Sequence, residues 1–109
     1  MSCYNTARII KGWEFTGEEY RRLLEATDYK WESFISPDHC MGEYYYYGIE
    51  LARVDECEVE MLDAGKLVMS YPDREELAEL KIDLAAAGLG DHEIFTEAAH
   101  LFLIHTAFY

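Results

Sequence analysis

The sequence predicts a small α+β fold, in which one mainly antiparallel sheet of three or four strands packs with two or three helices. The chain has 109 residues and half of them are apolar, which suits one domain with a core of ordinary size. Two segments rich in aromatic and branched side chains are typical of strands, and two others begin with helix-start signals. No repeat or Pro/Gly-rich boundary divides the chain, so we interpret residues 1–109 as a single acidic domain.

The N-terminal third predicts a strand followed by a helix. Residues 7–15 are largely apolar and indicate the first strand. Thr16 and Glu19 then form a capping-box pattern, which predicts a helix over residues 17–27. Residues 31–35 are a candidate short strand before the turn signal at residues 36–38.

The middle of the chain predicts further strands. Residues 44–54 begin with four consecutive tyrosines and continue with branched residues. Residues 56–62 alternate strictly, with glutamates on one face and apolar side chains on the other. A turn at residues 63–65 and a short return strand at residues 66–70 complete this region.

The C-terminal third predicts a helix over residues 72–87 that ends at Gly88. Its spacing indicates a broad apolar face of Leu77, Ala78, Leu80, Ile82, Leu84 and Ala85. Residues 91–106 also fit helical spacing, with Asp91 as a cap, and we expect a third helix there. The apolar run over residues 100–109 could equally form a buried strand, which is the alternative.

The charge balance points to basic partners. The chain carries 22 acidic and 9 basic residues, a formal net charge of −13. Such a surface repels nucleic acid and anionic membranes, so neither is an expected direct partner, and it attracts basic proteins. The three cysteines follow no disulfide framework, the start does not resemble a signal peptide, and the longest apolar run is too short to span a membrane. We therefore expect a cytoplasmic protein.

The chemistry-bearing side chains predict no catalytic residues, no metal site and no cofactor. The available cysteines and histidines lack the spacing of metal ligands; they are Cys3, His39, Cys40, Cys57, His92, His100 and His105. A neighbouring imidazolium could activate the Cys40 thiol beside His39, but neighbours in sequence need not meet productively in space. The Gly88–Gly90 turn follows a helix and has no lysine after it, unlike a phosphate-binding loop.

The acidic rows and the tyrosines are the candidate partner-binding residues. Glu56, Glu58 and Glu60 would lie about 6.6–6.8 Å apart along one strand face, a spacing that together with a second row could imitate phosphates at ~3.4 Å. A second row, with i, i+4, i+8 spacing, consists of Glu75, Glu79 and Asp83. Two of the four tyrosines could face outward as interface residues, and we assign Tyr45 and Tyr47. The alternative is that helices cover both faces of this strand, or that the tyrosines form cross-strand pairs that only stabilise the sheet. A merely solvated acidic face remains the alternative.

In its size, charge and layout the chain resembles the small accessory proteins of bacteriophages, in particular anti-CRISPR and anti-restriction inhibitors. The resemblance implies stoichiometric inhibition, in which an acidic face acts as a DNA mimic and occupies the basic groove of a bacterial defence nuclease. Two alternatives stay open: an acidic regulatory or antitoxin-like partner of another basic protein, and a small homodimeric protein with an unrecognised active site.

Overall fold

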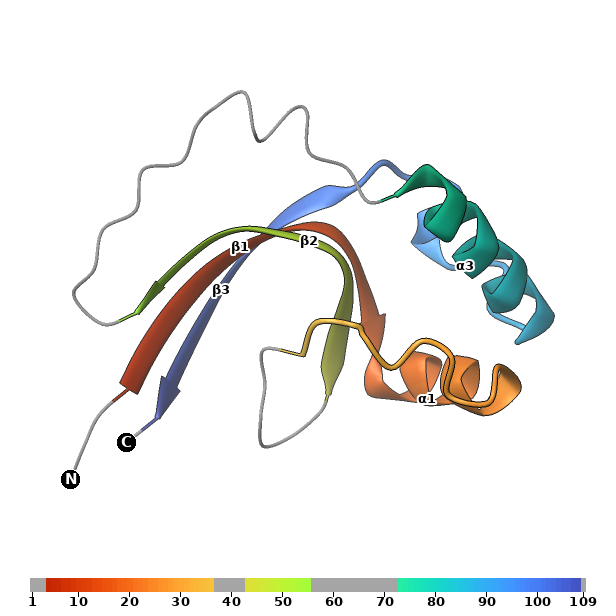
Figure 1. Cartoon of the computed structure of the whole chain (residues 1–109), viewed down its shortest axis with the longest axis horizontal. Helices are drawn as coiled ribbons and strands as arrows, with labels where there is room; N and C mark the ends of the chain where they lie inside the picture. Colours follow the sequence, from red (N-terminus) through yellow and green to blue (C-terminus); the bar gives the residue numbers. More distant parts are fainter. Residues whose placement is uncertain (1–3, 37–42, 56–72, 109) are drawn as a thin grey trace.

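A computed structural model describes residues 4–36, 43–55 and 73–108 of the chain, without the side chains of 4, 5 and 106–108. The elements are, in order, β1 (Tyr4–Thr16), α1 (Gly17–Ala26), β2 (Tyr44–Asp55), α3 (Arg74–Ala86), the 3-10 helix η1 (Glu93–Phe95) and β3 (His100–Phe108). The strands form one antiparallel sheet and both α-helices lie at one end of it (Figure 1). The predicted α+β class is confirmed.

The sheet has the order β2-β1-β3, so β1 is the central strand. Its residues 6–16 pair with β2 and residues 4–12 pair with β3. Leu51 is an extra residue in the β2 register, and it forms a bulge of the kind that bends and twists a strand. Gly12 and Gly48 are paired, and a Cβ on either would lie 2.0–2.1 Å from a carbonyl oxygen of the other strand. The two backbones therefore approach too closely there for any side chain.

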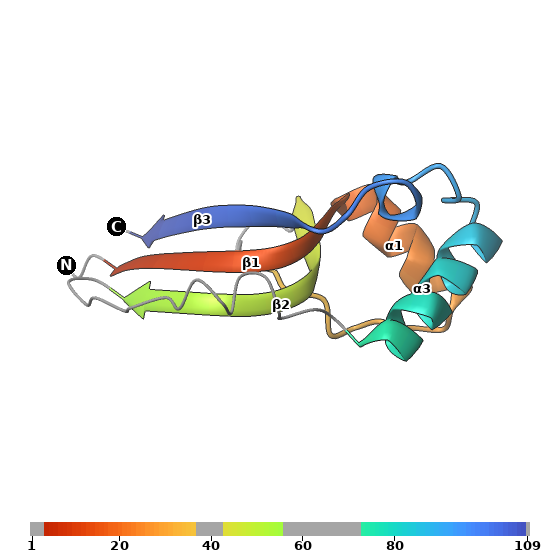
Figure 2. The same ribbon diagram turned by 90° about the horizontal axis from the view of Figure 1, so that it is seen from above.

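The helices cover only one end of the sheet, and the strands project away from them to the end where both termini lie (Figures 1 and 2). The core lies at the covered end and is rich in aromatic side chains. Its buried members are Trp13, Phe15, Tyr20, Leu23, Trp31, Phe34, Tyr47, Leu80, Leu84, Leu89 and Ile94.

The predicted capping box of α1 and the predicted glycine stop after α3 are confirmed, whereas α3 begins at Arg74, two residues later than predicted, with Asp73 as its cap. The Thr16 hydroxyl accepts a hydrogen bond from the Glu19 backbone N–H at 3.2 Å, and the Glu19 carboxylate accepts one from the Thr16 N–H at 2.9 Å. Asp73 Oδ1 accepts from two backbone N–H groups of the first turn of α3, at 2.8 and 3.2 Å. After α3, Gly88 has a φ of +80°, a conformation that glycine adopts without steric cost.

The predicted helix over residues 91–106 is wrong. Helical structure is limited to η1, which His92 rather than Asp91 caps, and the chain then forms strand β3. Pairing with the second edge of β1 supplies a continuous ladder of interstrand hydrogen bonds, and this outweighs the helical spacing of the apolar residues. The strand alternative was thus correct in type, but β3 is not fully buried: Leu101 and Leu103 are 53% and 77% exposed.

Two smaller expectations also fail. Residues 31–33 form turns, and of the candidate strand over 31–35 only a single bridge remains, in which Ile35 and Tyr46 exchange backbone hydrogen bonds of 2.8 Å. The apolar residues of α3 do not all face the core, since Leu80 and Leu84 are buried but Ile82 is 69% exposed. The elements predicted over residues 56–70 lie outside the described residues.

No helix in the described part of the chain is both long and apolar enough to cross a membrane.

Candidate functional site

The predicted acidic row of α3 is only partly open to a partner. The Lys30 ammonium bonds to Glu79 and lies 3.1 Å from Asp83 Oδ2, and the same Asp83 oxygen accepts from Trp31 Nε1 at 2.8 Å. The hydrogen bond to Glu79 is the main cause that raises the pKa of Lys30. Two of the three acids therefore anchor α3 to the segment after α1, although Glu79 is still exposed, and Glu75 extends the row into solvent.

Sequence reasoning missed Lys30 because it lies 49 residues from Glu79 in the chain, and only the folded arrangement brings the two together. Nothing in the sequence around Lys30 indicates that its ammonium group contacts Glu79.

The outward-facing side of α3, which we call the outer face of α3, consists of Glu75, Ala78, Glu79 and Ile82, all exposed. Ile82 is one of the most exposed large apolar side chains in the described part of the chain, at 69%. Carboxylates at i−3 and i−7 lie on the same side of the helix as Ile82. The face thus combines an apolar centre with negative charge beside it.

The tyrosines are arranged differently from the expectation that two would face outward. Tyr47 is buried and packs against Trp31 and Phe34, with ring centroids 6.2 and 5.4 Å apart. Tyr45 is half-buried, with its ring 4.2 Å from that of Tyr20. Neither offers an open aromatic surface to a partner.

On the opposite face of the strand, Tyr46 is buried and its hydroxyl donates to a Glu14 carboxylate oxygen at 2.8 Å. Tyr44 is 45% exposed and is the tyrosine of the four that remains available for contact. The other predicted acidic row, Glu56, Glu58 and Glu60, lies outside the described residues, as do all three cysteines and His39.

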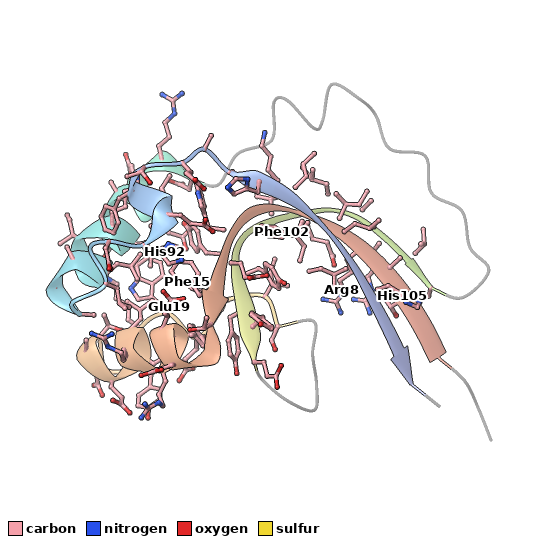
Figure 3. The ribbon with its side chains drawn as sticks, turned by 180° about the vertical axis from the view of Figure 1, so that it is seen from behind. Arg8, Phe15, Glu19, His92, Phe102 and His105 are labelled. Carbon is pink, nitrogen blue, oxygen red and sulfur yellow. The ribbon has the colours of Figure 1, made fainter. Side chains whose placement is uncertain are left out.

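His92 has a structural role. Its ring stacks on Phe15 with centroids 4.0 Å apart, and the two are close together between sheet and helices in Figure 3. Its Nδ1 accepts from the Ile94 N–H at 3.0 Å, which leaves Nε2 to donate to the Glu14 carbonyl oxygen at 2.8 Å. Both ring nitrogens are therefore used to hold η1 against β1.

A cluster that the sequence analysis did not identify lies next to η1. Glu93, Glu97 and His100 bring one ligand atom each within 4.8 Å of one another, and all three are exposed. His100 Nε2 lies 3.0 Å from Glu97 Oε2, and this contact is the main cause that lowers the pKa of Glu97. Carboxylates and imidazole suit a divalent ion, but three exposed ligands leave the remaining coordination positions to water.

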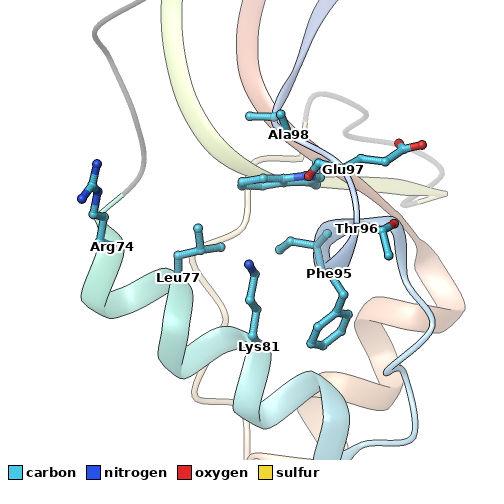
Figure 4. Close-up of a pocket in the computed structure, with 10 residues that line it drawn as sticks. Arg74, Leu77, Lys81, Phe95, Thr96, Glu97 and Ala98 are labelled. Carbon is cyan, nitrogen blue, oxygen red and sulfur yellow. The ribbon is translucent and has the colours of Figure 1, made fainter.

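A cavity of about 480 Å³ lies between α3 and residues 94–99 (Figure 4). Trp13 lines it, with its Nε1 donating to the Glu97 carbonyl oxygen at 3.0 Å. Arg74 and Lys81 come from α3, and Lys81 extends into the space beside Leu77. Neither cation forms an ion pair within the described residues. The cavity therefore combines apolar walls with two cationic side chains, and Glu97 is also part of its lining.

A comparison with family models, curated proteins and solved structures finds no match to this chain.

Proposed function

We propose that this chain is a stoichiometric, non-catalytic inhibitor that binds the basic, nucleic-acid-binding surface of a bacterial defence nuclease. The outer face of α3 is the observation that carries the proposal. Ile82 is 69% exposed there, beside the carboxylates of Glu75 and Glu79. An apolar centre with a polar rim is the usual composition of a protein–protein interface.

The net charge supports a basic partner. At −13 the chain produces a field that attracts cationic surfaces and accelerates encounter with them. A protein that normally holds nucleic acid presents such a surface, because it must neutralise phosphates. Competition with nucleic acid follows if the two ligands share one groove.

The ion pairs between Lys30 and α3 reduce the negative charge that the acidic row of α3 can offer to a partner. Lys30 already neutralises part of the charge of Glu79 and Asp83, so a partner cation competes with it for these carboxylates. We therefore expect the contact to combine burial of Ile82 with charge pairing at Glu75, and not to depend on a ladder of acids alone.

The test begins with affinity capture and mass spectrometry to obtain the partner, followed by binding measured at rising salt and with DNA or RNA as competitor. Binding should weaken steeply with salt, because exposed charge pairs are screened, and nucleic acid should displace the chain. A partner that has no affinity for nucleic acid would favour the antitoxin-like alternative.

Charge reversals locate the contact. Glu75→Lys with Glu79→Lys should abolish binding, whereas Glu18→Lys with Glu25→Lys, the same change on the exposed side of α1, should weaken it far less. Reversal of Glu56, Glu58 and Glu60 tests the other predicted row. If both the α3 reversal and this triple reversal bind as well as the parent protein, charge mimicry is wrong and the acidity serves only solvation.

The 480 Å³ cavity favours a second candidate function, binding of a small anionic ligand with an apolar body. Its volume falls in the range of about 300–1,000 Å³ that small-molecule sites occupy, and Arg74 and Lys81 supply the charge. Benzoate is a suitable probe: saturable binding that is lost in Lys81→Met would support this function, and its absence would leave the cavity without a ligand of this class.

A further inference from the structure

A second, smaller cavity lies at the outer edge of β2, where three parts of the chain meet. Its volume is about 200 Å³. The first turn of α3 contributes the acidic residues Asp73 and Glu76, and the remaining walls are Ser33, Phe34, Ile35, Tyr46, Tyr47, Gly48 and Ile49. The cavity is thus negatively charged on one side and aromatic on the other.

Tyr47 lines this cavity, and its buried hydroxyl lacks a hydrogen-bond partner. Only 7% of Tyr47 is exposed, and its hydroxyl oxygen is fully buried and forms no hydrogen bond. Burial raises the pKa of Tyr47 to about 12, with further contributions from the charges of Glu76 and Asp73. The hydroxyl is therefore protonated at neutral pH and lies within the field of the two carboxylates that line the same cavity.

An unsatisfied buried hydroxyl is costly, about 1–3 kcal/mol in typical proteins. Such a cost is often found where a group is kept for binding and not for folding. A hydroxyl can donate one hydrogen bond and accept others, so a ligand that donates to its oxygen would satisfy it.

The charge in the cavity favours a cation. Asp73 Oδ1 caps α3, but neither Asp73 nor Glu76 forms an ion pair within the described residues. The positive end of a helix amounts to roughly half an elementary charge. Two carboxylates outweigh it, and the local field stays negative.

We propose, on the basis of the function proposed above, that this cavity receives the cationic end of one lysine or arginine side chain of the partner. The Asp73 and Glu76 carboxylates pair with the charge, and the ring of Phe34 lies alongside. The Tyr47 oxygen, which is covered in the free chain, accepts an N–H group once the entering cation displaces the side chains that cover it. Aromatic faces attract cations. The cavity is smaller than the roughly 300 Å³ at which small-molecule sites begin, which suits a single inserted side chain.

The first test uses n-butylammonium chloride as a probe that needs no partner. It is titrated into isotope-labelled protein at constant ionic strength, with sodium chloride as the reference, and backbone amide shifts are followed by NMR. Saturable shifts at Tyr47, Gly48 and Glu76 are expected. Shifts that do not saturate, or that sodium chloride reproduces, would mean that the cavity holds only water and would overturn the proposal.

Three variants make the test specific. Glu76→Gln removes one charge and should raise the dissociation constant of the probe on the order of tenfold, since a partly desolvated ion pair is stronger than an exposed one. Tyr47→Phe removes only the hydroxyl and should weaken the probe while leaving the protein as stable as before, or more so. Glu18→Gln, a first-turn glutamate of α1 away from the cavity, is the matched control. Unchanged probe binding in Glu76→Gln or Tyr47→Phe contradicts the proposal.

The captured partner separates the two proposals. If Tyr47→Phe and Glu76→Gln bind the partner as tightly as the parent protein, the inserted-cation proposal is wrong although the inhibitor function stands. If the cavity binds butylammonium but the partner shows no competition with nucleic acid, the inhibitor function fails and the cation site remains.

Discussion

The two α-helices are capped alike but differ in how they distribute their apolar residues. α1 buries Tyr20 and Leu23 and presents mainly charged side chains to solvent. α3 buries Leu80 and Leu84, yet it also exposes Ile82. A helix whose outer side is polar needs no further contact, whereas an apolar outer side gains free energy when a partner covers it. The comparison supports the proposal that α3, unlike α1, binds a partner in addition to packing against the sheet.

The largest expected effect concerns the buried sides, where the two helices should behave alike. Leu80→Ala and Leu23→Ala should each lower the free energy of unfolding by about 2–5 kcal/mol, because both side chains are fully buried and leave a cavity. Urea denaturation measures the change. If Leu80→Ala lowers the free energy of unfolding by less than about 0.5 kcal/mol, α3 does not pack as described.

The next effect should separate the helices. Ile82→Asp should cost about 2 kcal/mol or more in partner affinity if Ile82 is an interface centre, with a change in unfolding free energy of roughly 0.5 kcal/mol or less because the side chain is exposed. Arg21→Asp on the outer side of α1 is the control and should affect partner affinity far less. Calorimetry of the complex measures the partner affinity, and denaturation of the isolated chain measures the free energy of unfolding. Equal losses of affinity in both variants would remove the distinction between the helices.

The caps test whether the helices begin in the same way. Thr16→Ala and Asp73→Ala should each lower stability by about 1 kcal/mol, because each removes a side-chain acceptor for backbone N–H groups of the first turn. Asp73→Asn should retain the cap and stability, since asparagine caps as well as aspartate. A stability loss in Asp73→Asn equal to that of Asp73→Ala would show that the charge matters more than the hydrogen bonds.

The smallest expected effect is a pH dependence of stability that comes from Tyr20, a buried titratable residue of α1. The Tyr20 hydroxyl donates to the Trp31 carbonyl oxygen at 2.7 Å, and burial is the main cause that raises its pKa above the ordinary 10.0. Because the pKa of Tyr20 is raised in the folded protein, folding favours the protonated hydroxyl. The contribution of this hydroxyl to the free energy of unfolding is therefore fully present below pH 10.0 and is lost as the pH rises above that value. The difference in unfolding free energy between the parent protein and Tyr20→Phe should therefore shrink above pH 10.0. A constant difference up to the alkaline unfolding limit would contradict the burial of this hydroxyl.

Local signals in the sequence determined both α-helices and the two strands β1 and β2. The capping box at Thr16, the acidic first turn and glycine stop of α3, and the aromatic and branched residues of residues 44–54 each act within a few residues of the element they specify. Such short-range effects are readable in one sequence. The net charge that points to a basic partner is likewise a property of composition alone.

The tertiary structure decided the rest, because it depends on contacts between distant residues. The last segment is a strand because β1 offers it an edge, although its apolar spacing also fits a helix. Lys30 neutralises acids on α3 that lie 49 and 53 residues away. The cavity that we propose as a cation site exists only because the fold brings Asp73 and Glu76 close to Tyr47. Hydrogen bonding across a sheet and charge pairing between segments are long-range terms, and no local pattern encodes them.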